Sequence, residues 1–181
     1  MLVTLSGLPG SGTSTVARRV ADDLEIAHLD GGSVFRALAA ERKVSLAAFA
    51  LLAESDAAID RALDDRLTER AVAGDVLIES RLAGWLAAAV GLVGVRVWLG
   101  CDDTERARRV AARDHLTVEE ALGANAAREG SERARYLAYY DIDLTDQRPY
   151  HLVLDSTTRS PDELAAEIVS RARWEAAEAS M

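Results

Sequence analysis

The chain begins with a short apolar segment that runs directly into a glycine-rich loop, and this junction constrains its fold more than any other feature. Residues 2–15 read Leu-Val-Thr-Leu-Ser-Gly-Leu-Pro-Gly-Ser-Gly-Thr-Ser-Thr. In the pattern G-x-x-x-x-G-K-[ST], backbone N–H groups cradle phosphate oxygens, the lysine reaches the β and γ phosphates, and the hydroxyl binds Mg²⁺. Gly7, Gly12 and Ser14 keep this spacing. The segment therefore predicts a strand, a phosphate-binding loop and a helix in succession.

Thr13 occupies the lysine position of that pattern. Lys43 is the one lysine of the chain, and arginines make up the rest of its 21 basic residues. The helix dipole, the backbone N–H groups and a cation bound at Ser14 remain available to phosphate. We therefore expect phosphate binding to survive and arginines to supply the charge at the transition state. The alternative is a strand-to-helix turn that binds nothing.

Composition limits the class of protein. With 181 residues, of which 49% are hydrophobic, the chain can bury the core of one domain. A formal net charge of −9 argues against sequence-independent binding to nucleic acid or to anionic membranes. Cys101 is the single cysteine, and the three histidines show no zinc-site spacing. With neither a signal peptide nor an apolar run of about 18 residues, we expect a cytoplasmic protein.

Apolar periodicity predicts strands that alternate with helices along the chain. The predicted strands are 2–6, 26–29, 76–79, 95–99 and 151–154. The predicted helices are 14–24, 34–42, 46–53, 57–73, 104–113 and 161–175, with caps at Ser45 and Asp56 and two further helices that start at Thr117 and Ser131. This order predicts an α/β fold in which a parallel sheet is covered on both faces.

Glu79 ends the third predicted strand, and Arg81 follows two residues later. A carboxylate at the end of a strand beside the loop strand is placed to order the hydration shell of Mg²⁺. We therefore interpret Glu79 as a metal-site residue and expect Arg81 to point into the same crevice. A solvated acid and a surface arginine are the alternatives.

Arginines are concentrated in two later segments. They are Arg106, Arg108, Arg109 and Arg113 in the first segment, and Arg128, Arg133 and Arg135 in the second. Acidic residues alternate with them, which is typical of a solvated helix face, so we expect most of these arginines to be structural. We expect two or three to close over bound phosphates from a mobile segment.

Together these features resemble the archaeal-type cytidylate kinases, a branch of the P-loop nucleoside monophosphate kinases. The resemblance covers nearly the whole chain, and its most specific segments are 7–15, 32–36, 77–85, 97–99, 128–136 and 140–143. It implies a P-loop NTPase fold with a doubly wound, parallel, five-stranded sheet. It also implies a core formed by residues 1–30, 75–113 and 145–181, a monophosphate-binding subdomain at about 31–74 and a lid at about 114–140.

The resemblance implies roles for individual residues. The ATP phosphates would lie on Gly7, Leu8, Pro9, Gly10, Ser11, Gly12, Thr13, Ser14 and Thr15. Mg²⁺ would be served by Ser14 and Glu79. The acceptor would contact Gly32, Arg36, Asp60, Arg66, Arg81, Gly84, Glu132 and Arg135, and the catalytic arginines would be Arg81, Arg128, Arg133 and Arg135. For Asp60 and Arg66, a structural ion pair is the alternative.

The expected activity is Mg²⁺-dependent transfer of phosphate from ATP to CMP and dCMP by a monomer that binds neither nucleic acid nor membrane. Such transfer needs no general base, because the acceptor phosphate is already an anion. Two alternatives stay open. Leu82 stands where bacterial-type relatives have an aspartate, and Ser33 stands where the archaeal pattern has one, so the acceptor could be another nucleotide or a small metabolite. Thr13 allows for a nucleotide-binding module without catalysis.

Overall fold

The computed structural model describes residues 1–178 and contains a parallel five-stranded sheet in the order β2-β3-β1-β4-β5. The strands are β1 (Leu2–Gly7), β2 (Ala27–Asp30), β3 (Val76–Glu79), β4 (Val95–Gly100) and β5 (Leu152–Asp155). The helices are α1 (Thr13–Leu24), α2 (Gly31–Glu41), α3 (Leu46–Ala53), α4 (Ala57–Val72), α5 (Ala83–Ala89), α6 (Asp103–Asp114), α7 (Val118–Tyr140) and α8 (Pro161–Glu178). The doubly wound α/β fold predicted from the sequence is confirmed.

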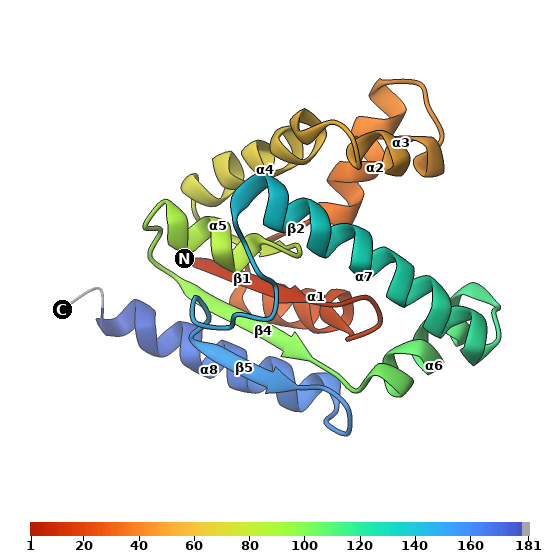
Figure 1. Cartoon of the computed structure of the whole chain (residues 1–181). Coiled ribbons are helices and arrows are strands. Elements are labelled where there is room, and N and C mark those ends of the chain that lie inside the picture. Colours follow the sequence, from red (N-terminus) through yellow and green to blue (C-terminus); the bar gives the residue numbers. More distant parts are fainter. Residues whose placement is uncertain (179–181) are drawn as a thin grey trace.

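Helices cover both faces of this sheet (Figure 1). On one face, α1 and α8 bury Val16, Val20 and Ile168 against β1, β3, β4 and β5. On the other face, α4 and α5 bury Leu67 and Ala83 against β1 and β3. Every residue of β1 is buried, as a central parallel strand with two covered faces requires. The carboxyl end of β1 is thereby held in a fixed position, and the glycine loop starts there.

The local chemistry of helix ends explains where the sequence predictions held and where they failed. Ser45 and Asp56 cap α3 and α4 as predicted, and Thr117 starts α7 with a capping box. The predicted start of α2 at residue 34 is wrong, because the side chain of Asp30 accepts hydrogen bonds from the backbone N–H groups of Gly32 and Ser33. The helix therefore begins three residues earlier.

The prediction of two helices that start at Thr117 and Ser131 is also wrong. Residues 118–140 form the single helix α7, because Ser131 bonds outward to Glu54 at a distance of 2.8 Å instead of capping a new helix. The short helix α5 was not predicted from the sequence. Among the described residues, no helix has both the length and the apolar character to cross a membrane.

Helix α7 lies alongside the carboxyl end of the sheet and connects two outer parts of the molecule (Figure 1). Near its C-terminal end, the hydroxyl of Tyr139 donates to the backbone carbonyl of Glu54 at 3.0 Å, at the end of α3. Nearer its middle, Glu129 accepts a hydrogen bond from Arg106 of α6. The helical segment α2–α4 and helix α6 are thus joined across the sheet edge through one rigid element.

Candidate functional site

The glycine loop between β1 and α1 has the backbone conformation of an anion-binding turn. Gly10 and Gly12 have φ angles of 84° and 88°, in the left-handed region where glycine is favoured. Gly10 also packs closely, since a Cβ atom there would lie 2.5 Å from the carbonyl oxygen of Arg106. Gly12 is the N-cap of α1, and no described side chain caps this helix. The N–H groups at the start of α1 can therefore bind phosphate.

Ser14 and Glu79 meet at the start of α1. The hydroxyl of Ser14 donates a hydrogen bond to Oε1 of Glu79 at 2.6 Å. Glu79 is buried at the end of β3, and its Oε2 lies 3.0 Å from Nε2 of His28 on β2. A hydroxyl and a carboxylate are oxygen ligands of the kind that Mg²⁺ prefers. No group of three or more His, Cys, Asp or Glu residues suited to a metal occurs in the described chain, so a cation here would share its ligands with phosphate and water.

Arg81 crosses from the end of β3 to both the loop and α7. Its Nη1 donates to the backbone carbonyl of Gly7, and its Nε donates to Glu132 at 2.8 Å. The other carboxylate oxygen of Glu132 accepts from Nε of Arg128, also at 2.8 Å. Burial opposes the charge on Glu132, but these two guanidiniums outweigh it, and the pKa of Glu132 lies below its usual range. The buried carboxylate thus holds two arginines beside the loop.

A second arginine and carboxylate pair joins α7 to α4. Nε of Arg135 donates to Asp60 at 2.9 Å, and Nη1 donates to the hydroxyl of Ser131 at 3.1 Å. One turn further along α4, the hydroxyl of Tyr140 donates to Asp64 at 2.6 Å. Burial is the main reason that the pKa of Asp64 is raised to about 7. We call the contact between α4 and α7 that these four residues form (Asp60, Asp64, Arg135 and Tyr140) the seam. It therefore contains charged and titratable groups in a mostly buried environment.

The remaining site residues expected from the resemblance, which include the catalytic candidate Arg133, lie on four different helices. Arg36 is exposed on the first turns of α2, where it donates to Ser33 at 2.7 Å and to Asp30 at 3.3 Å. Arg66 makes a two-pronged bond to Glu41 on the outer surface, which agrees with the structural ion-pair alternative. The other three are Gly32, exposed at the start of α2; Arg133, exposed on α7; and Gly84, packed against the ring of Tyr150.

The arginine-rich helix α6 contains two residues whose importance sequence reasoning missed. Arg106 is 3% exposed and donates to the carbonyl of Pro9 at 3.1 Å. Arg109 donates to Ser156 at 2.7 Å and also approaches the carbonyl of Ser11 at 3.4 Å. Both side chains bond to backbone carbonyls of the loop. Because the two residues are three positions apart in α6, they lie on the same face of the helix. Arg108 and Arg113 pair with neighbouring acids on the surface, as expected for structural arginines.

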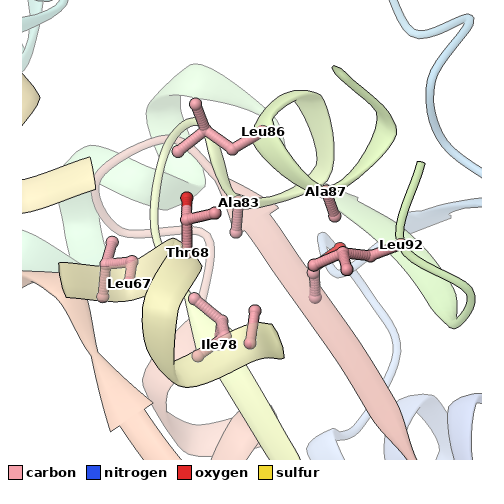
Figure 2. A pocket seen from close by; sticks show the side chains of 9 residues that line it. Leu67, Thr68, Ile78, Ala83, Leu86, Ala87 and Leu92 are labelled. Carbon is pink, nitrogen blue, oxygen red and sulfur yellow. The ribbon is translucent and has the colours of Figure 1, made fainter. Parts of the chain in front are cut away.

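An apolar crevice lies between α4, α5 and the sheet (Figure 2). The side chains of Leu67, Ile78, Leu86 and Leu92 line it, and its volume is about 10 Å³. This is the space of roughly one water molecule. The buried hydroxyl of Thr4 at its edge has no hydrogen-bond partner in the described chain. The crevice is too small for a nucleotide and is a packing gap.

Comparison with known sequences gives a consistent result. The profile of the Cytidylate kinase-like family matches residues 2–158. The chain is 46% identical to the cytidylate kinase of Halobacterium salinarum over 163 residues, which cover 90% of this chain and 84% of that protein. It is 42% identical to the cytidylate kinase of Methanocorpusculum labreanum over 92% of this chain and 93% of that protein. It is also 42% identical to the cytidylate kinase of Pyrococcus furiosus, over 90% of this chain and 83% of that protein.

Solved structures share the fold at low sequence identity. An uncharacterized protein from Eubacterium ventriosum has a TM-score of 0.72 and 14% identity, with 96% of this chain and 98% of that chain covered. Shikimate kinase from Acinetobacter baumannii, solved in complex with shikimate, has a TM-score of 0.61 and 18% identity, with 94% and 91% covered. At this level of identity, the likeness supports the P-loop kinase fold alone.

Proposed function

We propose that this chain, which belongs to the cytidylate kinase-like family, transfers the γ-phosphoryl group of ATP to CMP and dCMP. One observation carries the proposal beyond the family match. The loop, whose backbone suits phosphate, is contacted at Gly7 by Arg81, and Arg81 shares the carboxylate of Glu132 with Arg128 from α7. Two adjacent anion sites are what a reaction between two phosphates requires.

The proposed reaction is an in-line displacement at phosphorus. An oxygen of the CMP phosphate forms a bond to the γ-phosphorus, the bond from that phosphorus to the β–γ bridging oxygen breaks, and ADP leaves with the electron pair. No side chain needs to remove a proton, since the attacking oxygen is already anionic at neutral pH. Catalysis then rests on alignment, exclusion of water and neutralisation of charge by arginine.

Each part of the site has a distinct task in this proposal. The loop from Gly7 to Thr15 holds the ATP phosphates through backbone N–H groups. Arg81 and Arg135 hold the acceptor phosphate, while Glu132 and Asp60 keep these guanidiniums in position. The bonds that α7 makes to α4 and α6 support a role for this helix as a cover over both proposed phosphate sites, where it would exclude water.

The proposal includes magnesium at Ser14 and Glu79. Their oxygens lie 2.6 Å apart at the N-terminus of α1, and this donor set suits a hard cation. When bound, Mg²⁺ neutralises charge on the β and γ phosphates. Glu79 is held in place from its other side by His28, so its free lone pairs point along a fixed direction.

We also propose which segments of the chain form the moving parts of the enzyme. Helices α2–α4, within about residues 31–74, form the monophosphate-binding subdomain, and about residues 114–140 form the lid. Direct bonds from α7 to Glu54, Asp60 and Asp64 support a coupled closure of these two parts. We also propose that the protein acts as a monomer.

Turnover with a panel of acceptors tests the proposal. The purified protein is incubated with ATP and Mg²⁺ and with CMP, dCMP, UMP, AMP or GMP, and ADP formation is measured. We expect turnover with CMP and dCMP to exceed that with the other three. Faster turnover with another nucleotide would identify that nucleotide, and not CMP, as the acceptor. ATP binding without ADP formation in the presence of any acceptor would indicate a binding module without catalysis.

A further inference from the structure

The glycine loop has Thr13 where the pattern has lysine, and the side chain of Thr13 points toward Gly7. A cationic side chain, that of Arg81, contacts this same glycine. A Cβ atom built on Gly7 would lie 2.8 Å from Cγ2 of Thr13, so the side chain of Thr13 points toward Gly7. The guanidinium of Arg81 donates to the carbonyl oxygen of this same Gly7. Side chains from two segments that lie far apart in the sequence therefore converge on the first glycine of the loop.

The surroundings of Arg81 keep its charge fixed at this point. Its side chain is 17% exposed, and the side chain of Glu132 is 8% exposed. Glu132 holds the Nε of Arg81, Gly7 accepts from Nη1, and Nη2 has no hydrogen-bond partner among residues 1–178. The guanidinium thus has donors left for an incoming phosphate oxygen. Because Glu132 also binds Arg128, the three side chains together retain one positive charge.

Arg106 and Arg109 also contact the loop, but at positions other than Gly7, and acidic side chains already pair with them. Arg106 lies beneath the loop at Pro9, where Asp103 and Glu129 already pair with it. Arg109 lies at the other end of the loop, near Ser11, and is bound by the Ser156 carbonyl and by Glu105. Lys43 is exposed beyond the end of α2. Of these side chains, only Arg81 reaches Gly7.

We propose that Arg81 performs the task of the missing loop lysine and neutralises the donor's β and γ phosphates, in addition to holding the acceptor phosphate. The inference rests on the proposed function for the identity of the donor, ATP. It also makes a structural prediction. A lysine at position 13 would extend from Thr13 toward Gly7, so it would supply a second cation at the point that Arg81 serves.

Donor binding without any acceptor tests this proposal. The affinity for Mg²⁺ and the non-hydrolysable ATP analogue AMP-PNP is measured by calorimetry for the wild type, Arg81→Met, Thr13→Lys and the double variant. We expect Arg81→Met to weaken binding about 10- to 100-fold, as loss of charge-assisted hydrogen bonds does. Thr13→Lys in the Arg81→Met background should restore about tenfold or more. In the wild-type background, the same change should give no comparable gain.

Matched variants separate this role from general effects. Arg148→Met removes an exposed guanidinium that pairs only with Asp146 in the described chain, and its donor affinity should equal that of the wild type. Thermal melting checks folding, and Arg81→Lys provides a variant that keeps the charge should Arg81→Met unfold. We expect Arg81→Lys to bind AMP-PNP more tightly than Arg81→Met.

Two results would overturn the proposal. One is wild-type affinity for AMP-PNP in Arg81→Met. The other is rescue by Thr13→Lys of Arg109→Met but not of Arg81→Met, which would assign the lysine's task to Arg109. Because CMP is absent from the measurement, a wrong acceptor leaves these results unchanged, and failure of the proposed function is recognised separately from failure of this inference.

Discussion

The two proposed phosphate sites of this protein differ in composition, because one consists of backbone and the other of side chains. The donor side is a single stretch of backbone, residues 7–15, fixed by glycines with positive φ and by the buried strand β1. The proposed acceptor side consists of side chains, namely Arg81 from the end of β3, which also bonds to Gly7 of the loop, and Arg135 from α7. Each of these arginines is held by a buried carboxylate from another segment.

The loop is a preformed phosphate site, whereas the arginines of the acceptor side are already bonded to acidic side chains before phosphate binds. Backbone N–H groups at a helix N-terminus need no partner in the protein and meet phosphate without rearrangement. The arginines of the acceptor side already bond to Glu132 and Asp60, so a bound phosphate has to share them with these acids. We expect loss of Arg135 to affect turnover and changes at the loop to affect donor affinity, whereas loss of Arg81, which we propose serves both phosphates, should affect both.

Removing Arg135 should give the largest effect. Arg135→Ala removes a guanidinium group from the acceptor side and leaves Asp60 buried without its partner. We expect kcat/KM for CMP to fall about 10²- to 10³-fold, as the loss of one stabilising donor does. The KM for ATP should change little. Steady-state kinetics with each substrate varied measures both values, and activity equal to that of the wild type would remove Arg135 from the acceptor site.

A change at Gly12 should act on the other side of the comparison. Gly12→Ala places a Cβ atom on a residue with φ of 88°, and strain of this kind costs about 1–3 kcal/mol. We expect donor affinity to fall about 10- to 100-fold, while the affinity for CMP is kept. Calorimetric titration with AMP-PNP and then with CMP tells these apart. Equal losses for both ligands would show that the two sites are not independent.

The pH dependence of stability tests the seam between α4 and α7. Burial raises the pKa of Asp64 to about 7, whereas an aspartate in an unfolded chain titrates near about 3.9. Between these values the folded state keeps a proton that the unfolded state has lost. The free energy of unfolding therefore falls as pH rises from about 4 to 7, by at most about 1.4 kcal/mol per pH unit for one group.

Replacing this acid should remove that contribution. Asp64→Asn keeps a neutral group opposite Tyr140, so the variant should lose less stability between pH 5 and pH 8 than the wild type does. Urea unfolding at both pH values measures the difference, and Asp22→Asn on the exposed face of α1 is the control. The same pH dependence in the wild type and in Asp64→Asn would mean that Asp64 is ionised in the folded protein.

The smallest effect should come from Arg66. Its bond to Glu41 lies on the exposed surface, where ion pairs contribute little to stability. We expect Arg66→Ala to leave kcat/KM for CMP unchanged and to lower the melting temperature only slightly. Kinetics and thermal melting on the same sample check this. A selective rise in the KM for CMP would instead return Arg66 to the acceptor site, which would then extend along α4 to this residue.

Much of the fold was accessible from the sequence, because its signals act over short distances. Ser45, Asp56 and Thr117 cap their helices through side chains that bond to backbone two or three residues ahead. Ser131 is the instructive failure. A serine inside α7 has the same local signature as a cap, and only the position of Glu54, at the C-terminal end of α3, shows which bond it makes.

The sequence by itself determined the loop, its flanking strand and helix, and the position of Glu79 at the end of a strand. These features follow from glycine conformation and apolar periodicity, which act within short segments. The contact between Ser14 and Glu79 spans 65 positions and needs the strand order of the sheet. Only the tertiary structure decided which arginines face the loop. Arg81 meets Gly7 across 74 positions, and Arg135 meets Asp60 across 75. Such pairs depend on how α7 packs against α4 and the sheet edge, because a long charged side chain carries no local preference for one partner over another.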